Sequence, residues 1–176
     1  INNSSTGTVV TRGENAVGVF ALAIGGGGGD IGSNRDALSL GASGGNGGSS
    51  GNVTLTNAGN ITTLGTGSYG VVAKSVGGGG GRATANINEG TLSLGGSGGS
   101  GGSSGTVTLR NTGDVLTFGS SSIPVYLQSV GGGGGDVQSG FGDATLGSNG
   151  ATGRSGRTVL INTGTLQSNS EFSPAI

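Results

Sequence analysis

Val17-Gly-Val-Phe-Ala-Leu-Ala-Ile-Gly-Gly-Gly-Gly-Gly29 joins an apolar octad to a run of five glycines, and this arrangement occurs three times in the chain. The second copy spans residues 69–81 and the third spans residues 123–135. Successive glycine runs begin 52 and 54 residues apart, at Gly25, Gly77 and Gly131. The chain is therefore a repeat protein, and repetition favours a linear array in which each unit contacts its neighbours.

Each octad has the two-residue period of a β-strand. Lys74 and Gln128 lie on one face of their octads and mark that face as solvated. We therefore expect the opposite face to point into the core. In the three copies that inward face would carry Val17, Val19, Ala21 and Ala23; Tyr69, Val71, Ala73 and Ser75; and Ile123, Val125, Leu127 and Ser129.

The rest of each unit repeats in a fixed order. A variable stretch, where a binding specificity could differ between copies, precedes a short apolar pair and a glycine-serine tract. The tract has a period of three, which is typical of polyproline II but also of a linker. A second strand, an Asn-x-Gly turn and a third strand follow. The variable stretches are 30–37, 82–91 and 136–144; the later strands begin at Val53, Val107 and Val159, and at Ile61, Val115 and Leu166.

The composition favours a solenoid over a compact globular domain. The chain has 46 glycines among 176 residues and only 3% aromatic residues, so it can fill a narrow core but not a thick one. We expect an all-β fold, a β-solenoid that is one segment of a longer array, with approximate units 1–29, 30–81, 82–135 and 136–176. A unit of this length would make two or three turns, so about eight rungs would give a rod of roughly 40 Å.

The glycine runs and the Asn residues are the candidate structural positions of the repeat. A run of glycines destabilises a chain, so we expect it to form a corner or a close backbone approach; the alternative is a flexible linker. The Asn side chains are expected to tolerate left-handed backbone and to hydrogen-bond along the stack. The positions are Gly25, Gly29, Gly77, Gly81, Gly131, Gly135, Asn57, Asn111 and Asn162.

Several classes of site are disfavoured by composition. The chain has no Cys and no His, so it lacks disulfides, thiolate metal ligands and the commonest general base. Seven basic and eight acidic residues are scattered thinly, which argues against a nucleic-acid partner. No apolar run reaches the roughly 18 residues of a membrane span. We expect no enzyme activity, no cofactor and no metal.

Three weaker alternatives remain open. Asp30 and Asp136 follow glycine runs as in the calcium-binding nonapeptide, although Arg82 replaces the acid in the middle copy. A polysaccharide hydrolase would need two acids on one face, from among Glu14, Asp30, Asp36, Glu89, Asp114, Asp136, Asp143 and Glu171. Thr54-Leu-Thr56 and Thr106-Val-Thr108 resemble the threonine ladders of ice-binding or mineral-binding solenoids, but ordinary β-propensity explains them as well.

Two recurring sequences carry a family resemblance. Ala73-Lys-Ser-Val-Gly-Gly-Gly-Gly-Gly81 and Val53-Thr-Leu-Thr-Asn-Ala-Gly-Asn-Ile61 resemble the glycine-rich passenger repeats of large Gram-negative autotransporters, the type V secretion proteins. The resemblance implies a right-handed parallel β-helix on the outer surface of a Gram-negative bacterium, exported through a barrel that is not part of this sequence. Copy three departs from the pattern at Pro124 and in residues 147–157.

The expected function is a structural and adhesive module on the cell surface. It would act as a rigid stalk or fibre, with exposed Ser, Thr and Asn side chains contacting host, matrix or neighbouring-cell ligands. Self-association, lateral or end-to-end, is expected because the end of a solenoid exposes a strand edge.

Overall fold

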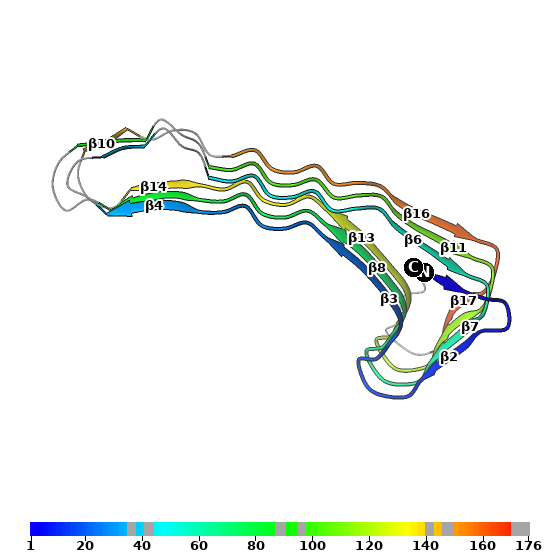
Figure 1. Ribbon diagram of the computed structural model, residues 1–176. Helices are drawn as coiled ribbons and strands as arrows, with labels where there is room; N and C mark the ends of the chain where they lie inside the picture. The colour runs from blue at the N-terminus through cyan, green and yellow to red at the C-terminus, as the bar shows by residue number, and fades with distance from the viewer. Residues whose placement is uncertain are drawn as a thin grey trace.

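The computed structural model describes residues 1–34, 38–40, 44–86, 91–94, 98–139, 143–145 and 150–169. These residues form an all-β fold of parallel sheets, of the β-helix or solenoid-like kind (Figure 1). Within these ranges there is no helix, and hence none long and apolar enough to cross a membrane.

Five parallel sheets make up the described part of the fold. The first contains β1 (Asn2–Asn3), β6 (Val53–Asn57), β11 (Val107–Asn111) and β16 (Thr158–Asn162). The second contains β2 (Thr8–Thr11), β7 (Asn60–Thr63), β12 (Val115–Thr117) and β17 (Leu166–Ser168). The octads form the third, with β3 (Val17–Ile24), β8 (Tyr69–Val76) and β13 (Ile123–Val130). All eight residues of each octad are strand, which confirms that prediction.

The two remaining sheets lie at the far end of the coil, beyond the glycine tracts (Figure 1). One contains β4 (Ile31–Asn34), β9 (Ala83–Asn86) and β14 (Val137–Ser139). The other contains β5 (Leu38–Leu40), β10 (Thr91–Leu94) and β15 (Asp143–Thr145). Most of the described residues of the variable stretches lie in the first of these sheets, while Thr91, Asp143 and Ala144 belong to the second. Residues 35–37, 87–90 and 140–142 lie outside the described ranges.

Each repeat makes one turn, so the expectation of two or three turns per repeat is wrong. The register pairs Val53 with Val107, and Val107 with Thr158, so each strand lies beside its counterpart in the next copy. The long glycine tracts run along a single wide coil (Figure 1), so a unit of this length closes only one turn. Three coils at about 4.8 Å each make a slab much shorter along the axis than the expected rod.

A narrow apolar core lies between the octads and the two sheets nearest to them. Its side chains form columns along the stack, because residues paired in a parallel register lie above one another. Leu55 and Leu109 form one column with Leu160, and Ile61 and Val115 continue another from Val9 to Leu166. The middle members of these columns are fully buried, whereas Val9, Leu160 and Leu166 in the outer coils are only partly buried.

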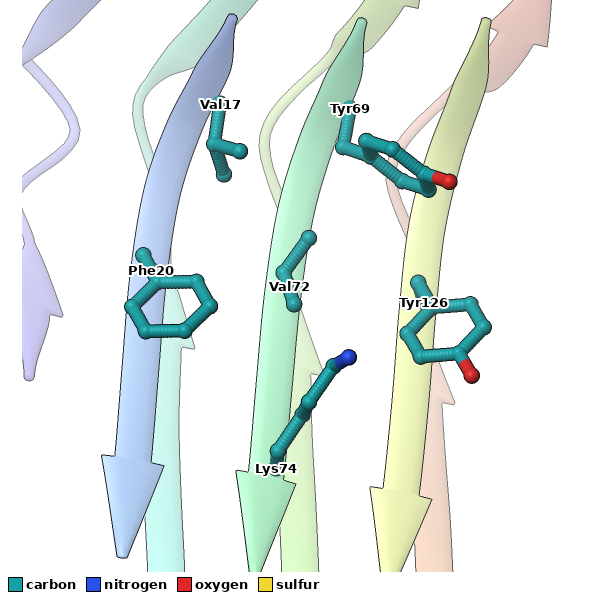
Figure 2. A pocket seen from close by; sticks show the side chains of 6 residues that line it. All are labelled: Val17, Phe20, Tyr69, Val72, Lys74 and Tyr126. Carbon is teal, nitrogen blue, oxygen red and sulfur yellow. The ribbon is translucent and has the colours of Figure 1, made fainter. Parts of the chain in front are cut away.

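The inward face predicted for the octads is wrong at their first residues. A side chain at Gly18 would lie 2.7 Å from Ile61 Cγ2, and one at Gly70 would overlap Val115 Cγ1, so both glycines point into the core. Val17 and Tyr69 consequently face outward (Figure 2). The two-residue period holds from Val71 onward, where Val71, Ala73 and Ser75 are buried. The alternation of inward and outward side chains breaks at the second octad position. Gly18, Gly70 and Pro124, which occupy that position, are not among the paired residues of the parallel register.

The Asn residues form a hydrogen-bonded ladder inside the fold. Asn57 Nδ2 donates to Asn111 Oδ1 at 2.6 Å, and Asn111 Nδ2 donates to Asn162 Oδ1 at 2.8 Å. Asn3 adds a further rung by donating to Asn57 at 2.7 Å. Each Nδ2 of Asn57, Asn111 and Asn162 also donates to the glycine carbonyl two residues ahead. The expected left-handed backbone is instead found at Asn15 and Ser121, because the ladder residues end strands.

The two glycine-rich tracts of each coil form an extended two-layer lattice. In the layer after the octads, Gly77 and Gly80 donate to Val130 and Gly133 of the next coil. The amides one residue later, those of Gly78 and Gly81, donate across to Gly48 and Gly45 in the other layer. Hydrogen bonds therefore recur every three residues, the period of polyproline II. The described residues of the tracts are packed into the fold along the narrow part of Figure 1 and do not behave as linkers.

Close approach of the layers excludes side chains from four of the five residues in an interior run. A Cβ at Gly77 or Gly80 would overlap a carbonyl oxygen of the opposite layer, and a Cβ at Gly78 or Gly81 would overlap one in the coil below. The middle residue, Gly79, points outward, and its nearest neighbour would be Gly133 O at 3.9 Å. The lattice therefore requires glycine for steric reasons at four positions and leaves the fifth open.

Polar side chains complete the lattice where the second tract faces solvent. Asn46 Oδ1, Ser49 Oγ and Asn52 Oδ1 accept the backbone N–H groups of Ser100, Ser103 and Thr106 in the next coil. Asp30 does the same for the amide of Arg82. These exposed side chains satisfy amides that neither the neighbouring coil's backbone nor the opposite layer reaches.

We predict that Asn111→Ala destabilises the fold by about 1–3 kcal/mol, since it removes two ladder bonds and leaves one Nδ2 hydrogen of the buried Asn57 without a partner. The free energy of unfolding in urea measures this effect. Asn2→Ala, at an exposed position beside the ladder, is the control and should change stability by less than about 0.5 kcal/mol. Equal stability of the two variants would contradict the structural role of the ladder.

We also predict that Gly78→Ala and Gly79→Ala differ sharply although they are adjacent. The first places a methyl group against Gly26 O and should cost about 1–3 kcal/mol or more. The second has open space and should be neutral or stabilise by up to about 1 kcal/mol, by restricting the unfolded chain. Thermal unfolding followed by circular dichroism compares them, and a flexible tract would make both substitutions alike.

Candidate functional site

The most distinctive surface feature is an aromatic groove on the outer face of the octad sheet. It has a volume of about 280 Å³ and is lined by Val17, Phe20, Tyr69, Val72, Lys74 and Tyr126 (Figure 2). Strand register produces it, because Phe20, Val72 and Tyr126 occupy one row across the three strands. Val72 is 5% exposed and forms the floor between two rings, whereas Phe20 is 51% exposed. This surface is what we call the aromatic groove.

The polar groups of the aromatic groove lie at its tyrosine side. The rings of Tyr69 and Tyr126 meet edge to face, with centroids 6.0 Å apart and planes at 77°. Lys74 Nζ lies 4.9 Å from the centre of the Tyr126 ring, a cation–π contact. The groove thus combines exposed ring faces with two hydroxyls and one cation. Such a surface can stack on a ligand and hydrogen-bond to it.

A surface ion pair lies directly after the second and third glycine runs, where the glycine layer that follows the octads ends. Arg82 Nε donates to Asp136 Oδ1 at 2.7 Å, and the Arg82 amide donates to Asp30 Oδ1 at 2.7 Å. The hydrogen bond and charge of Asp136 raise the pKa of Arg82. The two acids considered for calcium therefore both contact Arg82. Among the described residues, no group of three or more potential metal-ligating side chains comes together.

The candidate acids for sugar hydrolysis are not brought to the aromatic groove. None of its lining residues is acidic. Asp30 and Asp136 contact Arg82, and Asp114 Oδ1 accepts the amide of Thr165 in the next coil at 3.3 Å. Asp36, Glu89 and Glu171 lie outside the described residues, as does the side chain of Asp143.

The threonines considered for ice binding do not form a uniform ladder. The register places Thr54 beside Thr108, but the third member of that row is Val159. Thr56 lies beside Arg110, which is followed by Ile161. The outer face of this sheet therefore lacks the regular threonine array that the alternative requires.

The structure places the predicted repeat positions in two regions. The Asn residues form the ladder, which is buried at Asn57 and Asn111 and exposed at Asn162. Gly25, Gly77 and Gly131 stack where the octad sheet passes into the glycine layers, each facing a carbonyl of the opposite layer. Gly81 and Gly135 press on the coil below, while Gly29, in the first coil, has no atom near the position of a Cβ. None of these positions lines the aromatic groove.

Two serine pairs were not predicted from the sequence. Ser75 Oγ lies 2.7 Å from Ser50 Oγ, and Ser129 Oγ lies 2.7 Å from Ser104 Oγ, which ties the octad to the second tract of the same unit. Ser75 and Ser129 also donate to the carbonyls of Gly51 and Gly105. The sequence signal that could have revealed these pairs is that Ser75 and Ser129 occupy the same octad position, although copy one has Ala23 there.

Comparisons with known proteins identify no family for this chain. No family model matches it, and no curated protein matches it. One solved structure, a springtail antifreeze protein from Granisotoma rainieri described as a nine-helix polyproline type II bundle, is 23% identical over 89% of this chain and 90% of its own. Its TM-score is 0.12, so the two folds do not superpose and this likeness supports no conclusion about fold or activity.

Proposed function

We propose that this chain is a non-catalytic structural and adhesive module, a segment of a rigid cell-surface stalk or fibre. The supporting observation is the coil-to-coil lattice, in which backbone groups of successive coils bond along both the sheets and the glycine layers. Such a lattice gives stiffness without a thick core, because each added coil repeats the same bonds. A scaffold of this kind presents its outer faces in fixed positions.

The finer features of the fold belong to the same proposal. We take the coil to be right-handed, since connections between parallel strands of one sheet have that hand in nearly all proteins. We take the repeat to be 52–54 residues long, with this chain as one part of a longer array. Stacked bonds between residues 54 positions apart, such as Asn57 and Asn111, support that length, although the last junction is shortened to 51.

The aromatic groove supports the adhesive part of the proposal. Aromatic side chains often contribute most of the binding energy at binding surfaces. Phe20 and Tyr126 lie on either side of Val72, whose side chain is already buried from water. Ligands on host cells, in the extracellular matrix or on neighbouring cells, including glycans, would contact this groove. The resemblance to autotransporter passenger repeats supports display on the surface of a Gram-negative bacterium. Self-association of the modules, lateral or end-to-end, completes the proposed fibre.

We predict that the double substitution Phe20→Ala and Tyr126→Ala weakens binding of the purified chain to immobilised glycans and matrix proteins by about tenfold or more. Phe118→Ala is the matched control, since Phe118 is 43% exposed but does not line the groove. Circular dichroism checks that all variants fold. Equal binding by the double variant, or no binding by the unmodified chain to any surface, would overturn the adhesive proposal.

A further inference from the structure

The aromatic groove contains a row of three side chains that crosses the octad sheet, and we call it the stacking row. The register pairs Phe20 with Val72, and Val72 with Tyr126, so the row passes from β3 over β8 to β13. In Figure 2 each ring lies over its own strand, with Val72 between them. Parallel strands are about 4.8 Å apart, so the two rings are anchored roughly 9.6 Å apart. The stacking row thus has a ring at each end and a low centre.

This spacing fits a linear polysaccharide in an extended conformation. The flat faces of pyranose sugars carry C–H groups, which are attracted to the negative face of an aromatic ring. Each sugar residue of an extended β-linked chain advances by about the distance between neighbouring strands. One sugar could therefore stack on Phe20 and the next but one on Tyr126, with the residue between them over Val72. A ligand with a single ring would reach only one end of the row.

Lys74 adds a positive charge beside the centre of the stacking row. It follows Val72 by two residues on β8, and its Nζ extends toward Tyr126, 4.9 Å from the centre of that ring (Figure 2). Lys74 forms no ion pair with any residue in the described ranges, and none of the residues lining the groove is acidic. Hydrogen bonds between two charged groups are stronger than those between neutral groups. The groove therefore favours a ligand whose middle sugar residue carries an acid.

The two tyrosines supply polar contacts in a fixed arrangement. Their rings meet edge to face with centroids 6.0 Å apart, so each limits the movement of the other. Neither hydroxyl hydrogen-bonds to another residue in the part of the chain that the structure describes. Both are thus available to sugar hydroxyls, and ligand binding costs little side-chain ordering because the rings already lie on a paired sheet.

We infer that the aromatic groove binds an extended polysaccharide in which a uronic acid lies between two residues that stack on Phe20 and Tyr126. The sugar chain would cross β3, β8 and β13, with the uronate carboxylate accepting a hydrogen bond from Lys74 Nζ. A further coil would add a strand at the edge of the octad sheet and would leave this outward face open. The inference rests on the proposed adhesive function and names the class of its ligand.

Single-stranded nucleic acid is the other polymer that combines rings with negative charge. It brings a phosphate with every nucleotide, and the proteins that bind it line their grooves with several cations. Lys74 is the one cation among the residues lining the aromatic groove, and the chain carries a net charge of −1. An acid on every second residue matches one cation between two neutral stacking positions, so a uronate-containing polysaccharide fits better.

We predict that the purified 176-residue chain binds hexasaccharides of hyaluronan, an extended β-linked polymer in which glucuronate and N-acetylglucosamine alternate. Isothermal titration calorimetry measures the affinity. Reduction of the ligand's carboxyl groups to alcohols should weaken binding by about tenfold or more, because the charge-assisted hydrogen bond is lost. The disaccharide, which reaches only one ring, should also bind about tenfold more weakly than the hexasaccharide.

Variants assign these effects to single side chains. Lys74→Gln should weaken binding of the hexasaccharide by about tenfold but change binding of the carboxyl-reduced form by less than about threefold, since both changes remove the same contact. Gln128 occupies the equivalent place on β13, so the sheet accommodates this residue. Phe20→Ala should weaken both ligands by the same factor. Arg110→Gln is the matched control, because Arg110 is exposed, does not line the groove and removes the same charge.

Circular dichroism checks the folding of each variant. Failure of the hexasaccharide to bind, an equal loss for both ligands in Lys74→Gln, or tighter binding of a thymidylate hexamer would overturn the inference. Binding of matrix proteins that depends on Phe20 and Tyr126, without binding of the hexasaccharide, overturns this inference and leaves the adhesive proposal intact. Failure of the chain to bind any of these ligands overturns both.

Discussion

Backbone hydrogen bonding between coils about 4.8 Å apart is the constraint on which this structure depends. Along the sheets it sets the parallel register, and along the glycine layers it brings peptide groups so close that a Cβ at Gly78 or Gly81 has no space. Few bulky side chains are needed, because the columns through Leu55, Ile61 and Val115 fill the narrow core. The abundance of glycine thus follows from the lattice, and the small core follows from the abundance of glycine.

Polar side chains extend the same lattice into places that the backbone cannot reach. The Asn ladder carries hydrogen bonds through the interior, where an unpaired amide would be costly. On the surface, Asn46, Ser49 and Asn52 accept amides of the next coil, so their exposed position does not make them free ligand contacts. Function is therefore better sought where side chains do not accept backbone amides of the next coil, and the aromatic groove on β3, β8 and β13 is such a place.

Much of the fold could be predicted because the same strand and turn patterns recur in each repeat. The octads are strands over their full length, since their two-residue period is clear and the glycine runs end them. Phe20, Val72, Lys74 and Tyr126 lie on the octad face that was predicted to be solvated, but the complete aromatic groove could not be predicted, because Val17 and Tyr69 join it through a break in that period. Gly18 and Gly70 turn inward against Ile61 and Val115, which are distant in sequence, and Val17 and Tyr69 are thereby turned out beside Phe20 and Tyr126.

The sequence by itself determined that the chain is all-β, repetitive and built of parallel strands around a thin core, since period and composition are local properties. Only the tertiary structure decided how many turns a repeat makes. A glycine tract can form a corner that closes a short turn, or it can be an extended segment of one wide turn. Packing against the opposite glycine layer decides between the two. It also decided which glycines are required, since steric exclusion comes from coils more than fifty residues away. Contacts between successive coils, and not the residues of any one of them, gave the fold its register and its width.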